Sequence, residues 1–159
     1  MENFTKFYSL RTYVVGRLWF NIYFPRSNIG KHIRIDSKDY AKIFRQVIIW
    51  NQCVDEKYAS LFHVSFHLKS MSPRMNKFYS RLPIPFFVGL PGFCAKFWCI
   101  DTRNGDFHGF YKWQSKEHAM VYSKSYAMEF MAKRSVPESI YYEIMGYRGN
   151  KYNAYPDIS

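Results

Sequence analysis

Three histidines and a serine are the side chains in this sequence best suited to chemistry. His63, Ser65 and His67 alternate with large apolar residues, so on a β-strand they would share one face. An imidazole titrates near neutral pH, which suits a general base or a hydrogen-bond donor in a pocket. On a strand, His63 and His67 would lie about 13 Å apart and would need a partner strand to hold one metal ion. A pocket base, a hydrogen-bond donor and an ordinary interface histidine stay open as interpretations.

The third catalytic candidate, His108, depends on a predicted β-hairpin. Asn104-Gly105 is typical of a two-residue hairpin loop, and such a loop would place Asp101 opposite His108. A carboxylate beside an imidazole fixes its tautomer, which would give an oriented base. A solvated cross-strand pair at the end of the hairpin is the alternative.

The same hairpin register gathers large side chains on one face. Directly paired residues share a face, and the predicted pairs set Trp98 opposite Tyr111 and Lys96 opposite Trp113. Lys96 could therefore make a cation–π contact with Trp113. This face forms either the wall of a pocket or the core beneath the helices. With Ser65 from the other strand, the candidate ligand-binding residues are Ser65, Lys96, Trp98, Tyr111 and Trp113.

The elements that must position these residues follow one another in a recognisable order. Alternation predicts a strand over 60–69, with Phe62 and Val64 facing a core and His63 on the open side. Ser72-Pro73 predicts the start of a helix that carries Met75, Phe78, Tyr79 and Leu82 at helical spacing, until prolines end or kink it. A strand over 93–101, the hairpin return, a helix over 116–133 after Ser115 and a strand over 139–145 complete the pattern. The helical stripe of 116–133 is Ala119, Tyr122, Tyr126, Phe130 and Met131.

This β-α-β-β-α-β order predicts an α+β, ferredoxin-like unit over residues 58–146. Its antiparallel sheet would carry both helices on one face. Residues 1–57 form an N-terminal extension with a β-hairpin expected over 33–50, and residues 147–159 form a C-terminal tail. Within the extension, the apolar run 13–25 is interrupted by Arg17 and is too short to span a bilayer. Residues 4–24 would dock on the domain as a helix or make a peripheral membrane contact.

The open face of a ferredoxin-like sheet, where it stays apolar, needs a cover from a second copy or from extra chain. Residues 90–125 resemble the YdhR-type mono-oxygenases of the dimeric α+β barrel superfamily. The similarity rests on the Pro91-Gly92-Phe93 turn, on Lys96 with Trp98 and on Gly109 with Tyr111, followed by Trp113 and a helix with Ala119 and Tyr122.

The resemblance implies a homodimer that encloses a pocket for an aromatic or other apolar small molecule. It also implies a mono-oxygenase without a metal or organic cofactor, in which the deprotonated substrate reacts with O₂. The alternatives are a non-catalytic binding protein on the same fold, and a peripheral membrane or partner-docking protein that uses residues 1–28.

Composition narrows the choice of partner and compartment. The net charge is +11, but the basic residues are dispersed, so binding of nucleic acid is not expected. An anionic membrane surface or an acidic ligand remains open. Cys53, Cys94 and Cys99 show no CxxC spacing, which favours packed thiols in the reducing cytoplasm, with association at a membrane as the variant.

Overall fold

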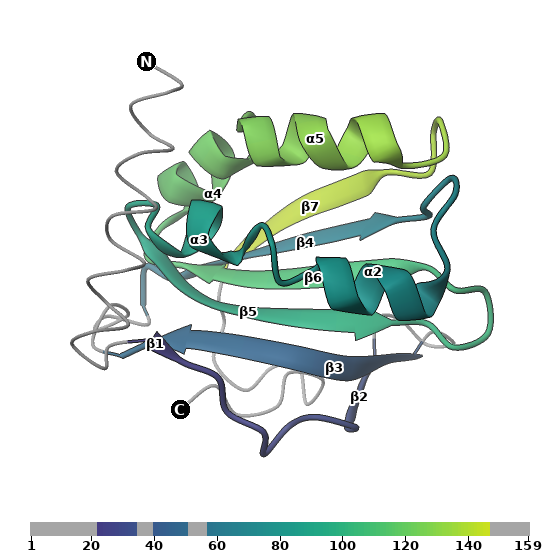
Figure 1. Cartoon of the computed structure of the whole chain (residues 1–159). Coiled ribbons are helices and arrows are strands. Elements are labelled where there is room, and N and C mark those ends of the chain that lie inside the picture. The colour runs from purple at the N-terminus through teal and green to yellow at the C-terminus, as the bar shows by residue number, and fades with distance from the viewer. Residues whose placement is uncertain (1–21, 35–39, 51–56, 147–159) are drawn as a thin grey trace.

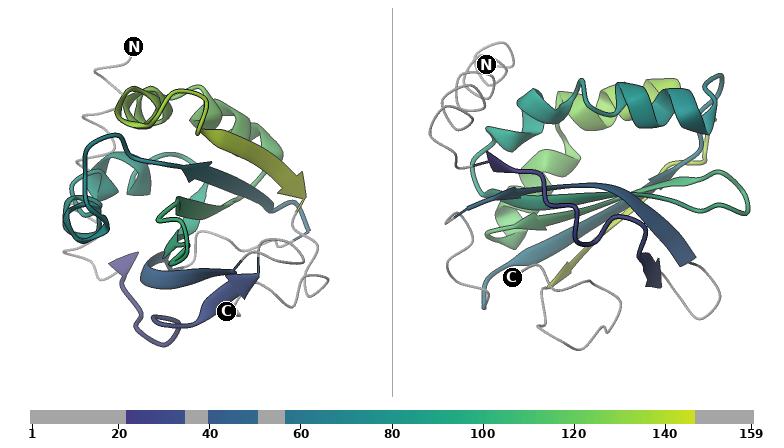
Figure 2. Two further views of the ribbon diagram at one scale, coloured as in Figure 1. Left: turned by 90° about the vertical axis from the view of Figure 1, so that its right-hand side faces the viewer. Right: turned by 60° about the horizontal axis from the view of Figure 1, so that its bottom comes forward.

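The predicted ferredoxin-like unit is present. The computed structural model describes residues 22–34, 40–50 and 57–146. Its central strands are β4 (Ser60–Phe66), β5 (Phe93–Ile100), β6 (Phe107–Trp113) and β7 (Tyr141–Gly146), which pair antiparallel in the order β5-β6-β4-β7. Helices α2 (Pro73–Tyr79), α3 (Ile84–Val88), α4 (Lys116–Ser123) and α5 (Tyr126–Arg134) lie on one face of the sheet (Figures 1 and 2).

Both predicted helix starts are confirmed, whereas the second helix is interrupted. The Ser72 hydroxyl accepts a hydrogen bond from the Met75 N–H at 3.3 Å, and Ser115 caps α4 in the same way. The predicted helix 116–133 breaks between Ser123 and Tyr126. Because the break changes the helical phase, Met128 becomes the buried residue of α5, while Tyr126 and Phe130 stay exposed.

The N-terminal extension continues the same sheet. Strand β3 (Tyr40–Ile49) pairs antiparallel with β5, and on its other side it pairs with β1 (Ile22–Tyr23) and β2 (His32–Arg34). The hairpin predicted over 33–50 is therefore confirmed for its described residues. Ile22 and Tyr23, near the end of the segment 4–24 that was expected to dock as a helix, lie on a strand instead. Residues 4–21 of that segment, and the C-terminal tail, lie outside the described residues.

The predicted two-residue loop of the β5–β6 hairpin is wrong. Asp101 and Asp106 are joined by a 2.9 Å backbone hydrogen bond, so the loop comprises residues 102–105. The Asn104 side-chain oxygen accepts from the Asp106 N–H at 2.9 Å, and Gly105 adopts φ +81°, which together stabilise the longer loop. The register shifts by two residues, so His108 lies opposite Cys99 and not Asp101. A shift of two leaves every side chain on its predicted face.

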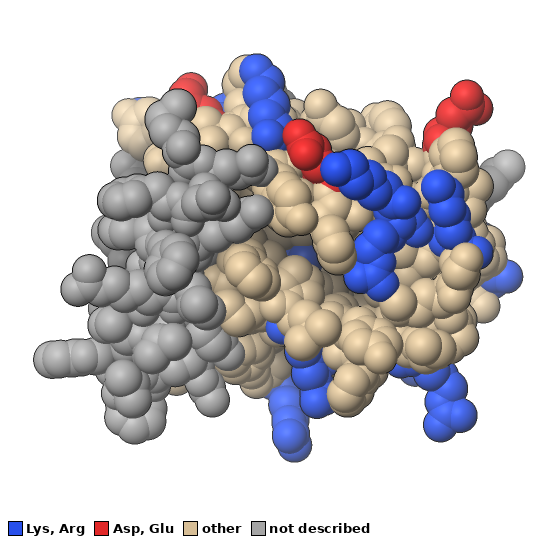
Figure 3. Space-filling view, turned by 45° about the horizontal axis from the view of Figure 1, so that its top comes forward, with Lys and Arg blue, Asp and Glu red and all other residues tan. Residues whose placement is uncertain are grey.

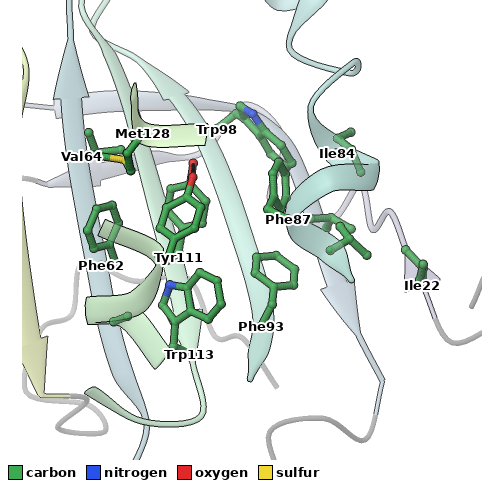
Figure 4. Packing of buried hydrophobic residues seen from close by; sticks show 14 residues of the cluster. Ile22, Phe62, Val64, Ile84, Phe87, Phe93, Trp98, Tyr111, Trp113 and Met128 are labelled. Atoms are coloured by element: carbon green, nitrogen blue, oxygen red, sulfur yellow. Dashed lines mark hydrogen bonds between the residues drawn. The ribbon is translucent and has the colours of Figure 1, made fainter. Parts of the chain in front are cut away.

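Both faces of the sheet are buried. Under the helices lies the main core, in which Phe62, Val64, Tyr111 and Trp113 pack against residues of α3, α4 and α5 (Figure 4). The opposite face, here called the open face, holds a second buried cluster, made of Ile33, Ala41, Ile43, Phe97, Cys99 and Phe110. Since β2 and β3 contribute to that cluster, the extension covers part of the face for which a second copy was expected. A homodimer stays a prediction.

The cysteines differ from the expectation. Cys94 is disulfide-bonded, and Cys99 is a free, buried thiol whose pKa is raised by burial. The argument for a reducing compartment assumed that all three were thiols, and it fails at Cys94. Within residues 22–34, 40–50 and 57–146, no helix is both long and apolar enough to cross a bilayer.

Candidate functional site

The residues predicted to share one pocket are divided between the two faces of the sheet. His63 and Ser65 of β4 and His108 of β6 lie on the open face, since His63 is paired with Phe110 and Ser65 with His108. Lys96, Trp98, Tyr111 and Trp113 point to the helices. The prediction that imidazoles and large aromatic rings border one cavity is therefore wrong, because residues of opposite parity on neighbouring strands cannot converge.

On the open face, a carboxylate and two imidazoles form a chain of hydrogen bonds. Glu143 Oε1 lies 3.2 Å from His63 Nδ1, and His63 Nε2 lies 3.1 Å from His108 Nδ1. The His63 ring stacks on Phe110 at 4.4 Å and is 4% exposed. Burial lowers the pKa of His63, although the Glu143 carboxylate opposes that effect. Two of the three catalytic candidates are thus joined in one relay.

Glu143 was missed by the sequence reasoning. Its strand was predicted over 139–145, and alternation already separates it from the apolar Tyr142 and Ile144. What the pattern did not give is the β4–β7 register, which sets Glu143 directly opposite His63.

His67 stands apart from this relay. Its Nδ1 lies 2.8 Å from Asp106 Oδ1, at a place where His67 is exposed and Asp106 is half-buried. The predicted pairing of Asp101 with His108 is replaced, since the Asp101 carboxylate accepts from the Arg103 guanidinium at 2.6 Å. That contact holds the pKa of Asp101 below its usual range.

Beneath the helices, Lys96 occupies a cage of three aromatic rings. Its Nζ lies 4.2 Å from the centre of the Trp98 ring, 4.2 Å from that of Tyr111 and 4.4 Å from that of Phe87. Lys96 is 5% exposed, and burial, helped by the charge of Arg45, lowers its pKa well below the ordinary value. Trp113, its predicted cation–π partner, is 1% exposed and belongs to the core against Phe93.

A second cation, Arg45, lies beside the cage. Its guanidinium is 5.8 Å from the Trp98 ring centre and donates to the Lys77 carbonyl at 2.7 Å and to the Ser80 hydroxyl. Burial and the neighbouring charge of Arg81 lower its pKa to about 10. Arg45 follows a bulge between Ile43 and Arg45, which breaks the alternation and hides its orientation from sequence analysis. Phe87 was missed because the prolines were expected only to end or kink the preceding helix, whereas Pro83 precedes a further short helix, α3 (Ile84–Val88), that carries Phe87.

Two buried tyrosines complete this site. The Tyr122 hydroxyl donates to the Tyr111 hydroxyl at 2.8 Å, and Tyr111 is also one wall of the cage. Burial raises the pKa of both, so both hydroxyls stay protonated. Because Tyr111 accepts from Tyr122, its own proton is left to donate elsewhere.

The charge around this site favours an anion. Buried cations are normally paired with carboxylates. In the described part of the chain, the groups that shift the pKa of Lys96 and Arg45 include no carboxylate. Figure 3 shows the helix-bearing side of the molecule, where a hollow has blue Lys or Arg atoms inside it and further Lys and Arg side chains above and below it. We call Lys96 with Phe87, Trp98, Tyr111 and Arg45 the lysine cage.

Comparison with solved structures identifies the fold. An uncharacterised ferredoxin-fold protein from Listeria monocytogenes, related to antibiotic biosynthesis monooxygenases, aligns with a TM-score of 0.51 and 12% identity over 86% of this chain and 89% of that one. A monooxygenase-like protein from Listeria innocua gives 0.51 and 8% identity, over 87% of each chain. The heme-degrading enzyme LmHde from Listeria monocytogenes gives 0.50 and 13% identity, over 86% of this chain and 94% of its own.

These likenesses define an α+β, ferredoxin-like fold of the kind seen in proteins related to antibiotic biosynthesis monooxygenases. None of the three is described as a YdhR-type protein, so the narrower resemblance stays a prediction. No protein-family profile matches the sequence, and no curated protein matches it either.

Proposed function

We propose that the protein binds an acidic aromatic small molecule in the lysine cage and oxidises it with O₂, as a cofactor-independent mono-oxygenase. The observation that carries the proposal is the buried amine of Lys96, held between three aromatic rings next to a second cation. Aromatic rings offer stacking area to a flat ligand, and the Arg45 guanidinium, whose pKa is shifted by no carboxylate among the described residues, would stabilise a negative charge on it. The monooxygenase-like fold supports the same reading.

The residues of the cage suit the first step of such a reaction. A lysine whose pKa is well below its ordinary value is in part a neutral amine, and a neutral amine accepts a proton. Lys96 would take the proton from an acidic C–H group of the substrate. The resulting Lys96 ammonium, the Arg45 guanidinium and the Tyr111 hydroxyl would then stabilise the substrate anion.

The rest of the reaction needs only O₂ as the oxidant. The substrate carbanion adds to O₂ and forms a peroxide, and loss of water from that peroxide leaves a carbonyl group. In balance, a CH₂ group and one O₂ give a C=O group and one H₂O. No external reductant enters the reaction, because the substrate carbon supplies the electrons.

The runner-up is a non-catalytic protein that binds the same ligand at the same site. An aromatic cage around a cation can hold a ligand without chemistry, and the fold alone does not distinguish the two. Binding without oxygen consumption would favour it.

Oxygen consumption with anthrone tests the proposal. Anthrone carries an acidic CH₂ group between aromatic rings, and its oxidation by one O₂ gives anthraquinone and water. We expect the wild-type protein to consume O₂ faster than buffer, and Lys96→Met to lose about tenfold or more of that rate. Native mass spectrometry of the purified protein would show whether an aromatic compound is bound already.

A matched control comes from the other face of the sheet. Lys112 is also a buried lysine, at 3% exposed, but it lies on the open face, so Lys112→Met should leave the rate unchanged. Loss of activity in His63→Phe together with full activity in Lys96→Met would place the chemistry at the histidine relay and would contradict the proposal.

A further inference from the structure

Helix α2 carries its apolar side chains outward. Met75 and Phe78 of α2, and Leu82 in the turn that follows it, are 49%, 64% and 65% exposed. No residue of α2 is buried. In an amphipathic helix of a globular protein, this stripe would face the core. Here it faces away from the sheet.

The neighbouring helix extends the same surface. Phe86 of α3 is 46% exposed, whereas Phe87, next to it in sequence, is buried against Lys96. We call Met75, Phe78, Leu82 and Phe86 the α2–α3 patch. A contiguous group of large apolar side chains in water usually marks a binding surface.

The α2–α3 patch is interleaved with positive charge. Arg74 and Arg81 are exposed beside it, and Lys77 lies between them on α2. The sequence contains no Asp or Glu from residue 57 to residue 100. Arg81 is close enough to Arg45 for its charge to lower the pKa of the Arg45 guanidinium, so these cations repel one another. Helices α2 and α3 and the turn between them therefore carry no acidic side chain.

Hydrogen bonds from Arg45 anchor the C-terminal end of α2. The Arg45 guanidinium bonds to the Lys77 carbonyl and to the Ser80 hydroxyl at the end of the helix. The helix thus keeps a fixed position while it contributes no apolar side chain to the core.

We propose that the α2–α3 patch docks on an anionic lipid surface. An interfacial segment places aromatic and leucine side chains at the level of the lipid headgroups and sets Lys and Arg around them against anionic lipid. The patch has this arrangement of apolar stripe and flanking cations, with no acid to oppose it. A lipid surface also imposes no fixed shape on its partner, which suits one short helix and the turn that follows it.

The docking surface adjoins the helix that carries one wall of the lysine cage. Phe86, in the patch, and Phe87, a wall of the lysine cage, are consecutive residues of α3. A membrane that contacts Phe86 would therefore lie close to the cage. The surface is independent of the proposed oxidation, and each can fail without the other.

Vesicle co-sedimentation tests the proposal. The full-length protein is mixed with phosphatidylcholine vesicles that contain either no phosphatidylglycerol or about one third of it. We expect binding to the anionic vesicles that weakens as salt is added. The triple variant Phe78→Ser, Leu82→Ser, Phe86→Ser should lose about tenfold or more of the partition coefficient. The double variant Arg74→Gln, Arg81→Gln should bind more weakly and depend less on salt.

The control variant removes equally exposed rings elsewhere. Tyr58 and Tyr141 are 63% and 58% exposed, and Tyr141 is paired with Ser65 on the open face. Tyr58→Ser with Tyr141→Ser should bind as wild type does. Because all three substituted patch residues are surface residues, circular dichroism should show the triple variant folded.

Two results would overturn the proposal. The triple variant could bind anionic vesicles as well as wild type does, and loss of that binding in Leu18→Ser with Trp19→Ser would then assign the contact to the N-terminal segment. Wild type could also sediment as a dimer that the triple variant dissociates, with no vesicle binding, which would make the patch a contact between two copies.

Discussion

Replacing Lys96 by methionine should remove a pH dependence from the stability of the folded protein. The folded-state pKa of Lys96 is lowered well below 10.5 by burial and by Arg45, whereas the unfolded chain keeps an ordinary lysine. Between the two pKa values the unfolded state binds one more proton than the folded state. The free energy of unfolding therefore rises with pH in that window, because the penalty for folding with an uncharged lysine disappears as the unfolded lysine also loses its proton.

The size of the effect follows from one proton. A difference of one bound proton changes the free energy of unfolding by about 1.4 kcal/mol per pH unit. The wild-type free energy of unfolding minus that of Lys96→Met should therefore rise with pH, by up to that amount per pH unit, between the lowered folded-state pKa and the ordinary lysine pKa of 10.5, and should level off above it. Tyr111 and Arg45 face the same site, and the Cys99 thiol acts on Lys96 from the open face of the sheet; all three groups are present in both proteins, so their effects largely cancel in the difference. Methionine keeps the volume of the side chain, so Lys96→Met should be the more stable protein at neutral pH.

Urea titrations at several pH values, followed by tryptophan fluorescence, would measure the difference. Lys124→Met, which removes one exposed positive charge, controls for the change in net charge. Parallel curves for wild type and Lys96→Met over the whole pH range would refute the reasoning. Lys96 would then be charged in the folded protein, and an anion would have to balance it.

Two further predictions concern other sites. Gly92 and Gly105 have similar backbone angles, φ +76° and φ +81°, but an added Cβ would lie 2.4 Å from the His118 ring at Gly92 and would meet open space at Gly105. Gly92→Ala should therefore lower the free energy of unfolding more than Gly105→Ala does. Urea unfolding should show a difference of about 1 kcal/mol or more between the two variants. Burial lowers the pKa of His63, so the folded protein should lose stability as pH falls below about 6.5, where the unfolded histidine binds a proton. His63→Phe should lose less stability than wild type between neutral and mildly acidic pH, and equal losses in both would contradict this assignment.

Sequence patterns predicted the helices and strands better than they predicted the register of the strands and the contacts between side chains. Alternation and capping found the β-α-β-β-α-β order, because each signal depends on residues close together in the chain. The hairpin loop was misjudged because Asn104-Gly105 suits both a two-residue loop and the end of a longer one. That error did not change the face of the sheet on which each side chain lies, so Lys96, Trp98 and Tyr111 were correctly predicted to share one face. Nothing local indicated Arg45, since its orientation depends on a bulge in a strand from the extension.

The unfavourable free energy of burying Lys96 is the strongest argument that the lysine cage serves a function. A buried lysine surrounded by aromatic carbon loses its hydration and, in the described residues, has no carboxylate to replace it. A leucine or methionine at the same position would fill the space between Phe87, Trp98 and Tyr111 at lower free energy. The histidine relay is different, because each of its imidazoles has a hydrogen-bond partner and the relay is therefore compatible with a purely structural role. Of the two faces, the one under the helices thus has a polar group that packing alone does not explain, and a bound anion would explain it.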